Sequence, residues 1–252
     1  MIPSHFHILH FPEIESTNNY AQSHLKELSL PTFIYADYQS KGKGQQNNVW
    51  HSEPQKNLLS TIVLPVYLPI QKQYYLSQWI SLIIIKVLVQ LGISQDLIKI
   101  KWPNDILVKT NDGYKKISGI LIENNIDNQI ITTSIIGIGL NINQTSFQQL
   151  QKTATSVALL TQKNFSIESV IELLLKSISE YYDIIQLQKF NAISEQYTQY
   201  LLGWQTDFLF KEQNNILKGK IIHLFEDGRI KVKLSDENNE KIYTNKQIQF
   251  LL

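Results

Sequence analysis

Residues 101–141 read KWPNDILVKTNDGYKKISGILIENNIDNQIITTSIIGIGLN, and this stretch decides the fold class. Apolar runs predict four strands in and around it, at 97–101, 106–108, 117–123 and 129–138. Asn111-Asp112-Gly113 is a turn signal, and the last two strands form a hairpin. Strands that follow one another without an intervening helix do not fit regular βαβ alternation. The sequence therefore favours an α+β fold built on a mixed sheet.

The sequence on either side supplies the rest of this main domain. Further strands are expected at 5–11, 32–38 and 58–64, and helices at 15–28, 71–91, 166–188 and 190–202. Ser16 is the expected N-cap of the first helix, because a short side-chain oxygen can accept a free first-turn N–H. Residues 39–48 are polar and show no periodicity, which predicts a loop.

The composition of the chain changes after Gly203. Short strands separated by polar turns are expected at 206–210, 216–224, 229–234, 240–244 and 247–251. Several short strands in so small a segment predict a small β-barrel. We place the domain boundary at Gly203–Trp204, with a main domain over 1–203 and a second domain over 204–252.

Composition and charge exclude several classes of protein. Of the 252 residues, 43% are hydrophobic and 18% charged, and the formal net charge is +1, which favours neither nucleic acid nor an anionic membrane as partner. The absence of cysteine excludes disulfides, thiolate nucleophiles and Cys-ligated zinc. The apolar stretch 80–91 is interrupted by polar residues and indicates a buried helix. With no signal peptide recognised at the N-terminus, we expect a cytoplasmic protein.

Generic motifs for nucleotide and metal binding are missing. No P-loop occurs, the glycine pattern at 42–44 is incomplete for a dinucleotide fold, and no His-Glu-x-x-His is present. His5 and His7 share one face of the first expected strand, where a solvated surface is favoured over a metal site. We therefore expect no protein-bound metal.

Two segments combine glycine with lysine or polar groups. In 38–44, glycines alternate with lysines, so a mobile backbone can approach an anion; the alternative is an ordinary surface loop. Residues 101–105 have a tryptophan before proline and then Asn-Asp, which suits a tight turn between strands, with or without a functional role.

A third unusual feature is glycine inside neighbouring strands. Gly119 lies in one expected strand, and Gly137 and Gly139 lie in the next. Glycine within a strand marks a bulge or the close approach of another group. Three of them in two adjacent strands indicate a ligand lying on the sheet.

Taken in order, five segments resemble the biotin–protein ligase family. They are Glu15-Ser16-Thr17-Asn18, Ala36-Asp37-Tyr38-Gln39 with the Gly-Lys-Gly loop, Lys101-Trp102-Pro103-Asn104-Asp105, Lys116-Ile117-Ser118-Gly119-Ile120-Leu121 and Gly137-Ile138-Gly139-Leu140-Asn141. Each is weak alone, but five in this order are specific. The resemblance implies a catalytic domain like that of class II synthetases, followed by an SH3-like β-barrel. The resemblance begins close to Met1, so we expect the DNA-binding domain of the repressor members to be absent.

The resemblance implies an ATP-dependent enzyme that forms biotinyl-5′-AMP and transfers biotin to a lysine of a biotin carboxyl carrier protein. It implies a catalytic role for Lys116 and Lys43. Asp105 is either a catalytic group that orients or deprotonates the carrier lysine, or a structural residue that holds the 101–105 turn. Biotin-binding positions are Ser16, Thr17, Asn18, Gln39, Gly42, Lys43, Gly44, Gln45, Lys116, Gly119 and Ile120. ATP- or adenylate-binding positions are Trp50, Lys101, Asn104, Lys116, Gly137, Gly139 and Asn141. Mg²⁺ is expected to arrive on the triphosphate, because magnesium prefers substrate phosphates to an all-protein cage.

The loop departs from the family pattern, which is closer to Gly-Arg-Gly-Arg. Here it reads Gly42-Lys43-Gly44-Gln45, followed by Gln46-Asn47-Asn48. Lysine keeps the charge without the bidentate fork of arginine, and glutamine keeps hydrogen bonding without charge.

Two alternatives remain besides the biotin ligase. A lipoate–protein ligase shares the fold, but its Arg-Arg-x-Ser-Gly-Gly-Gly type motif does not occur here. A non-catalytic biotin-binding regulator would not need Lys116, Trp50 and the 101–105 motif. We expect no nucleic-acid or membrane partner, and either a monomer or a homodimer.

Overall fold

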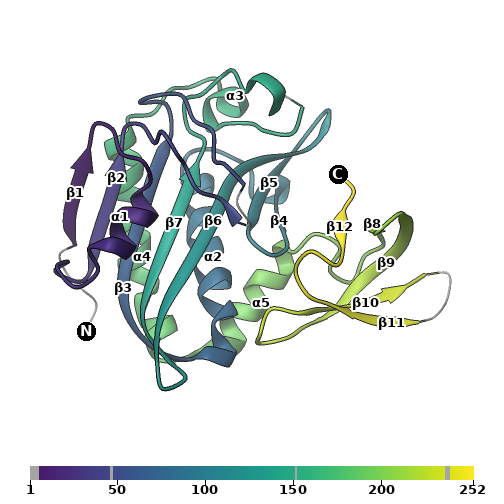
Figure 1. Ribbon diagram of the computed structural model, residues 1–252. Coiled ribbons are helices and arrows are strands. Elements are labelled where there is room, and N and C mark those ends of the chain that lie inside the picture. The colour runs from purple at the N-terminus through teal and green to yellow at the C-terminus, as the bar shows by residue number, and fades with distance from the viewer. Residues whose placement is uncertain (1–5, 46–47, 151, 236–238) are drawn as a thin grey trace.

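The main sheet has seven strands in the spatial order β1-β2-β3-β7-β6-β5-β4 (Figure 1). The computed structural model describes residues 6–45, 48–150, 152–235 and 239–252. The strands are β1 (His7–Phe11), β2 (Thr32–Ala36), β3 (Leu58–Pro69), β4 (Ile98–Lys101), β5 (Asp105–Thr110), β6 (Gly113–Asp127) and β7 (Ile130–Leu140). β1 and β2 are parallel and the other neighbours antiparallel, so the expected mixed sheet is confirmed.

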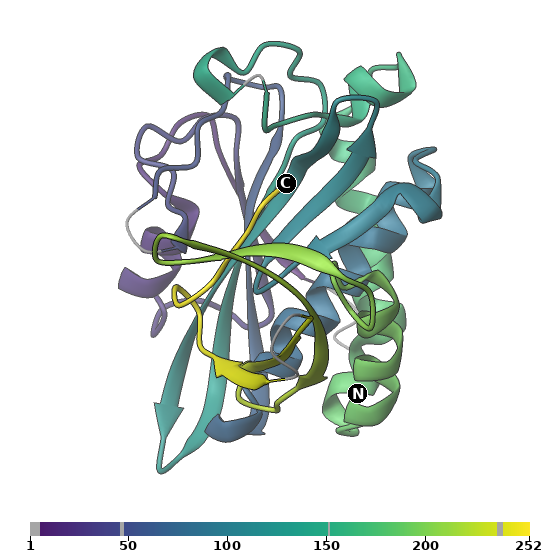
Figure 2. The ribbon, with the colours of Figure 1, turned by 90° about the vertical axis from the view of Figure 1, so that its right-hand side faces the viewer.

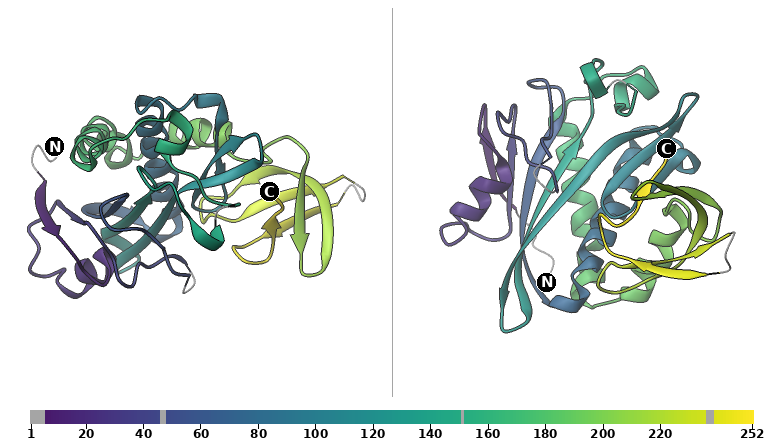
Figure 3. Two further views of the ribbon diagram at one scale, coloured as in Figure 1. Left: turned by 90° about the horizontal axis from the view of Figure 1, so that it is seen from above. Right: turned by 45° about the vertical axis from the view of Figure 1, so that its right-hand side comes forward.

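Helices cover both faces of this sheet (Figure 3). They are α1 (Thr17–Ser23), α2 (Tyr74–Gln90), α3 (Val157–Thr161), α4 (Ile167–Gln186) and α5 (Phe190–Tyr200), with short 3-10 turns at Ile70–Lys72, Gln95–Leu97 and Gln148–Leu150. Strand residues alternate between the faces: Phe33 and Ile62 belong to the large core under α2, whereas Ile34 and Val63 pack with Ala21 of α1. Each face therefore has its own apolar cluster.

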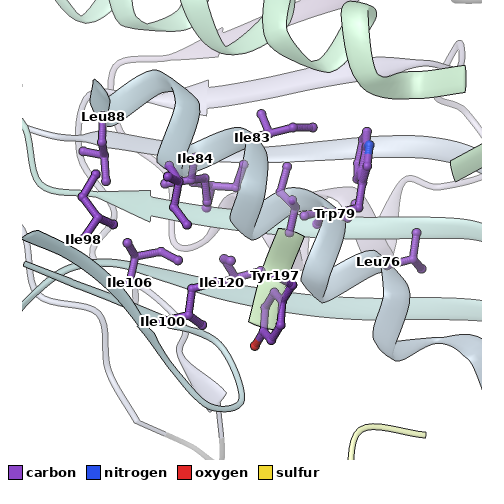
Figure 4. Close-up of a cluster of buried hydrophobic side chains, with 14 of the residues drawn as sticks. Leu76, Trp79, Ile83, Ile84, Leu88, Ile98, Ile100, Ile106, Ile120 and Tyr197 are labelled. Carbon is purple, nitrogen blue, oxygen red and sulfur yellow. The ribbon is translucent and has the colours of Figure 1, made fainter. Parts of the chain in front are cut away.

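The main core lies between α2 and the antiparallel strands (Figure 4). Leu76, Trp79, Ile83, Ile84 and Leu88 of α2 face strand residues Ile98, Ile100, Ile106 and Ile120. The Trp79 ring is 1% exposed, and its Nε1 donates to the Tyr181 carbonyl of α4 at 2.9 Å. Burying this much apolar surface is the principal driving force for folding, and it fixes the sheet on which the site is built.

The predicted hairpins are confirmed, and the first helix is shorter than expected. Gly113, with φ of +106°, closes the β5–β6 turn. Asn128 and Gln129, with φ of 47° and 68°, both adopt the left-handed region that a two-residue hairpin turn requires. α1 ends at Ser23 instead of near residue 28. The Ser23 hydroxyl donates to carbonyls of the preceding turn, and such local bonds compete with helix propagation.

The C-terminal segment forms a second, antiparallel sheet in the order β11-β10-β9-β8-β12 (Figure 2). Its strands are β8 (Phe208–Glu212), β9 (Asn215–Leu224), β10 (Ile230–Leu234), β11 (Glu240–Tyr243) and β12 (Gln249–Phe250). The five expected strands are confirmed. The small β-domain expected here takes the form of an open sheet: within the described residues, no ladder joins β11 to β12, and β12 has only two residues with which to pair.

A tight turn attaches the second sheet to the main domain. Trp102 donates from Nε1 to the Gly228 carbonyl at 2.8 Å, and Tyr75 donates to Glu226 Oε1 at 3.3 Å. A Cβ on Gly228 would lie 2.8 Å from the Tyr74 ring, and its φ of +89° also favours glycine. The domain boundary at Gly203–Trp204 stays a prediction. Among the described residues, no helix has the length and hydropathy needed to cross a bilayer.

Candidate active site

One cavity gathers most of the predicted site residues. Its empty volume is about 460 Å³, and it opens between the 38–50 loop, α1 and strands β6 and β7. The predicted residues that line it are Ser16, Thr17, Asn18, Gln39, Lys43, Gly44, Gln45, Trp50, Asn104, Lys116, Gly119, Ile120, Gly137 and Gly139. Ser60, Leu121 and Ile138 line it as well and were not predicted. The fold thus brings together segments as far apart in the sequence as Ser16 and Gly139.

A chain of hydrogen bonds orders the α1 end of the cavity. Ser16 caps α1 by accepting from the Asn19 N–H at 3.4 Å, which confirms the predicted cap. Thr17 donates to Gln39 Oε1 from its backbone N–H at 2.7 Å and from its hydroxyl at 3.1 Å. Because Gln39 accepts with its oxygen, its amide NH₂ is the end left for a ligand; among the described residues it has no partner.

Asn18 and Lys43 meet on one carboxylate. Asn18 donates from Nδ2 to Glu123 Oε2 at 3.0 Å, and Lys43 Nζ lies 2.7 Å from Glu123 Oε1. Burial raises the pKa of Glu123, but the hydrogen bonds from Lys43 and Asn18 outweigh it, so the pKa falls below its ordinary value. Glu123 is therefore a charged anchor for the loop at neutral pH.

Other groups lie close to the strand glycines, as expected. In this structure these groups are the side chains of Trp50 and Asn18. A Cβ on Gly139 would lie 2.5 Å from the Trp50 indole, and one on Gly119 would lie 3.0 Å from it. A Cβ on Gly137 would lie 2.2 Å from Asn18 Oδ1. Trp50 Nε1 is buried without a partner among the described residues, so the indole presents a free donor within the cavity.

Lys116 points its ammonium group toward Trp50 and Asp105. Its Nζ lies 2.6 Å from Asp105 Oδ1 and 5.4 Å from the centre of the Trp50 ring. Asn104 donates from Nδ2 to the Ile120 carbonyl at 2.6 Å, which fixes the 101–105 turn against β6. The Lys116 side chain is 36% exposed and lines the cavity.

Four predicted residues lie outside the cavity lining. Lys101 and Asp105 line an adjoining cleft that also contains Asn245, Lys246 and Gln249 of the second sheet region. Gly42 shapes the loop instead, since a Cβ there would lie 2.4 Å from the Trp50 carbonyl.

Asn141, at the end of β7, is 4% exposed and donates from Nδ2 to the Thr155 carbonyl at 2.9 Å. Its Oδ1 is buried and lacks a partner within the described residues, so it could still serve a ligand. A contact between Asn141 and a nucleotide stays a prediction.

Residues 10–141, more than half of the chain, match the model of the Biotin/lipoate A/B protein ligase family. The chain belongs to the biotin/lipoate A/B protein ligase family. The matched range contains every predicted site residue. The bifunctional ligase/repressor BirA of Bacillus spizizenii is 29% identical over 244 residues, which cover 94% of this chain and 72% of that protein.

Solved structures of biotin protein ligases share the fold. The biotin protein ligase from Aquifex aeolicus in complex with biotin and ATP superposes with a TM-score of 0.75 at 23% identity, over 96% of this chain and 97% of that one. The biotin acetyl coenzyme A carboxylase synthetase from Helicobacter pylori with bound biotinylated ATP gives 0.61 at 24% identity, over 95% and 99%. Both likenesses include the second sheet.

Sequence reasoning missed two polar residues at this ligase site. Thr61 is fully buried in β3 and donates to Asn18 Oδ1 at 2.6 Å, and Glu123 anchors Lys43. Thr61 carried a signal, because it is a polar residue inside a largely apolar strand. Glu123 did not, because it ends the apolar run of β6 and is followed by the polar residues Asn124 and Asn125. His7 is exposed, as expected for a solvated face, whereas His5, Gln46 and Asn47 lie outside the described residues.

Proposed function

We propose that this chain is an ATP-dependent biotin–protein ligase. It forms biotinyl-5′-AMP from biotin and ATP, then transfers biotin to a specific lysine of a biotin carboxyl carrier protein. The observation that carries the proposal is the single cavity in which Thr17, Asn18 and Gln39 lie together with Lys116 and the strand glycines. The relatives named as biotin ligases support this choice within the family.

The α1 end of the cavity suits the ureido ring of biotin. A urea offers two N–H donors and one carbonyl acceptor, and all three need partners once buried. The Ser16 and Thr17 hydroxyls can accept or donate, and the Gln39 amide NH₂ can donate to the carbonyl. Ile120, Gly119 and the glycine-rich face of β7 then suit the apolar rings and chain, with Gly42, Gly44 and Gln45 in the covering loop.

In the first step a carboxylate oxygen of biotin attacks the α-phosphorus of ATP. A new oxygen–phosphorus bond forms, the bond to the bridging oxygen breaks, and pyrophosphate leaves. Two anions must meet, so the Lys116 ammonium, reinforced by Lys43, offsets their repulsion and stabilises charge in the transition state. Mg²⁺ would come with the triphosphate, because magnesium is held mainly by substrate phosphates and water rather than by an all-protein cage.

The adenylate would lie between the loop and the sheet. Trp50 offers an aromatic face for adenine once its indole is displaced from Gly139. The side-chain amides of Asn104 and Asn141 lie nearby, and Gly137 allows a close approach to the backbone of β7. Lys101 offers a second cation from the adjoining cleft.

In the second step the neutral amine of a carrier lysine attacks the carbonyl carbon of the mixed anhydride. AMP leaves, and the new amide loses one proton. The cleft that contains Lys101 and Asp105 gives the carrier access from the side of the second sheet. Asp105 could orient the incoming amine, although the two lysines around it favour a role in placing Lys116.

An acyl-adenylate assay separates this function from its alternatives. The protein is incubated with radiolabelled ATP and either biotin or lipoate. We expect biotinyl-adenylate alone; a lipoate ligase would form lipoyl-adenylate, and a regulator without catalysis would form neither. A cytoplasmic location, a lack of DNA and membrane partners, and the choice between monomer and homodimer remain predictions.

A further inference from the structure

Glu123 of β6 is the point at which two parts of the site meet. Its two carboxylate oxygens have different partners: Oε1 receives the Lys43 ammonium at 2.7 Å, and Oε2 receives Nδ2 of Asn18 at 3.0 Å. Lys43 is separated from Glu123 by 80 residues and Asn18 by 105. One side chain thus connects the loop, the first helix and the central sheet.

This carboxylate decides which way the Asn18 amide faces. A carboxylate only accepts hydrogen bonds, so the amide must present Nδ2 to Glu123. The opposite end fits this orientation, because Asn18 Oδ1 accepts from the Thr61 hydroxyl at 2.6 Å. The amide packs where a Cβ on Gly137 would be, and its Nδ2 also lies 3.5 Å from the Leu121 carbonyl, a second group that can only accept. Asn18 is therefore held in one of its two flip states before any ligand enters.

The same carboxylate holds the loop. Among its described residues, the loop closes on itself through backbone bonds from the Gly44 N–H to the Asn48 carbonyl at 2.7 Å, from the Asn48 N–H to the Gln45 carbonyl at 3.1 Å and from the Trp50 N–H to the Gly42 carbonyl at 2.9 Å. Lys43 adds a charged contact to β6. An ammonium has three N–H donors, so binding Glu123 leaves others for an anionic ligand.

We propose that Glu123 is a positioning residue, one that holds Lys43 over the cavity and sets the hydrogen-bonding direction of Asn18 in the same arrangement. The proposal rests on the proposed ligase function. It assigns to one carboxylate the coupling between the Asn18 amide and the placement of Lys43 over the cavity. Its removal should release the reactive adenylate even when both Lys43 and Asn18 are present.

The dissociation rate of preformed biotinyl-adenylate tests this coupling. Glu123→Gln keeps an acceptor for Asn18 but removes the charge that holds Lys43, and we expect dissociation to become about tenfold faster, which is 1.4 kcal/mol. Lys43→Gln removes the same ion pair by changing the exposed loop and leaving the strand unaltered. It replaces Glu123→Gln in the test if that variant folds poorly. The double variant should dissociate no faster than the faster single variant, because both changes remove one interaction.

A matched control isolates the effect from general loss of an ion pair. Lys86 and Glu180 form a 2.5 Å pair between α2 and α4, so Glu180→Gln should leave the dissociation rate unchanged. An unchanged rate in Glu123→Gln, or additive effects in the double variant, would overturn the proposal. If the unmodified protein forms no biotinyl-adenylate from biotin and ATP, the ligase function fails instead, so the two failures are distinguishable.

Discussion

The ammonium nitrogen of Lys116 lies 2.6 Å from Asp105 Oδ1, and Lys101 Nζ approaches the other oxygen at 3.4 Å. Asp105 begins β5 and pairs in register with Lys101 at the end of β4. The carboxylate therefore stands between two cations and keeps them apart. The direction in which Lys116 faces the cavity depends on this partner.

Replacement of Lys116 by alanine should abolish adenylate formation while leaving the fold intact. Losing one preorganised cation from a transition state costs on the order of 3 kcal/mol, or at least about a hundredfold in rate. Pyrophosphate exchange measures this step alone, and circular dichroism checks the fold. Exchange at a near-normal rate in Lys116→Ala would remove this residue from the first step.

Asp105→Asn should slow the first step as well as the transfer step. Asparagine retains the shape but loses the charge that holds Lys116, so we expect a fall of about tenfold or more in pyrophosphate exchange. A residue that acted only on the carrier lysine would leave exchange intact and slow only transfer from preformed adenylate. That second pattern would assign Asp105 to the incoming amine.

Gln45→Arg should slow the release of biotinyl-adenylate. Charge-assisted hydrogen bonds are about twice as strong as neutral ones, and Gln45 replaces an arginine of the usual loop pattern. In this structure Gln45 Oε1 accepts from Asn245 Nδ2 at 3.2 Å, a neutral bond to the second sheet region. The measurement is the dissociation rate of preformed adenylate.

An alternative explanation is that Lys41 supplies the positive charge that Gln45 lacks and so holds the adenylate in its place. Lys41 Nζ lies 2.6 Å from Glu15 Oε1, and both side chains are largely exposed. Because Lys41 does not line the cavity, we expect Lys41→Ala to leave release unchanged. Faster release in Lys41→Ala, together with no effect of Gln45→Arg, would make compensation the correct account.

The contribution of Glu123 to stability should disappear in acid. Burial raises its pKa, but the bonds from Lys43 and Asn18 prevail and leave it below the ordinary 4.5. A lowered folded pKa means that the contribution is complete above the unfolded pKa and is lost as pH falls through the folded value. In urea titrations near neutral pH, the wild type should have a larger free energy of unfolding than Glu123→Gln. This difference in unfolding free energy should shrink below about pH 4. A gap that widens in acid would contradict the assignment.

Trp102→Phe should weaken both stability and carrier biotinylation. The substitution removes the indole N–H, so the Gly228 carbonyl loses its hydrogen bond from Trp102. The free energy of unfolding should fall by about 1–2 kcal/mol. Truncation at Gly203 is a poorer test, because Phe210 and Ile221 belong to the main core. Trp79→Phe is the matched control: it loses a similar bond to Tyr181 and should lower stability but not biotinylation. Equal biotinylation by the two variants would show that the attachment of the second sheet does not matter for transfer.

The sequence by itself determined the strands, the mixed sheet, nearly all of the cavity lining and the helices other than the short α3 at Val157–Thr161. Periodicity sufficed for β6, β7 and α2, because long apolar patterns report burial directly. The ordered motifs sufficed for residues such as Thr17, Lys116 and Gly139, since their spacing is specific to the family. The helix end at Ser23 was misplaced because side-chain bonds within the last turn do not alter the apolar pattern.

Only the tertiary structure decided which groups meet. Glu123 reads in sequence as one charge within a strand, and its partners lie 80 and 105 residues away. The strand glycines predicted a close approach but not that Trp50 makes it. Nor did the pattern of short strands reveal that β11 and β12 are left unjoined in the described chain. Hydrogen-bond partners and sheet closure depend on distances between remote segments, and local periodicity carries no record of those distances.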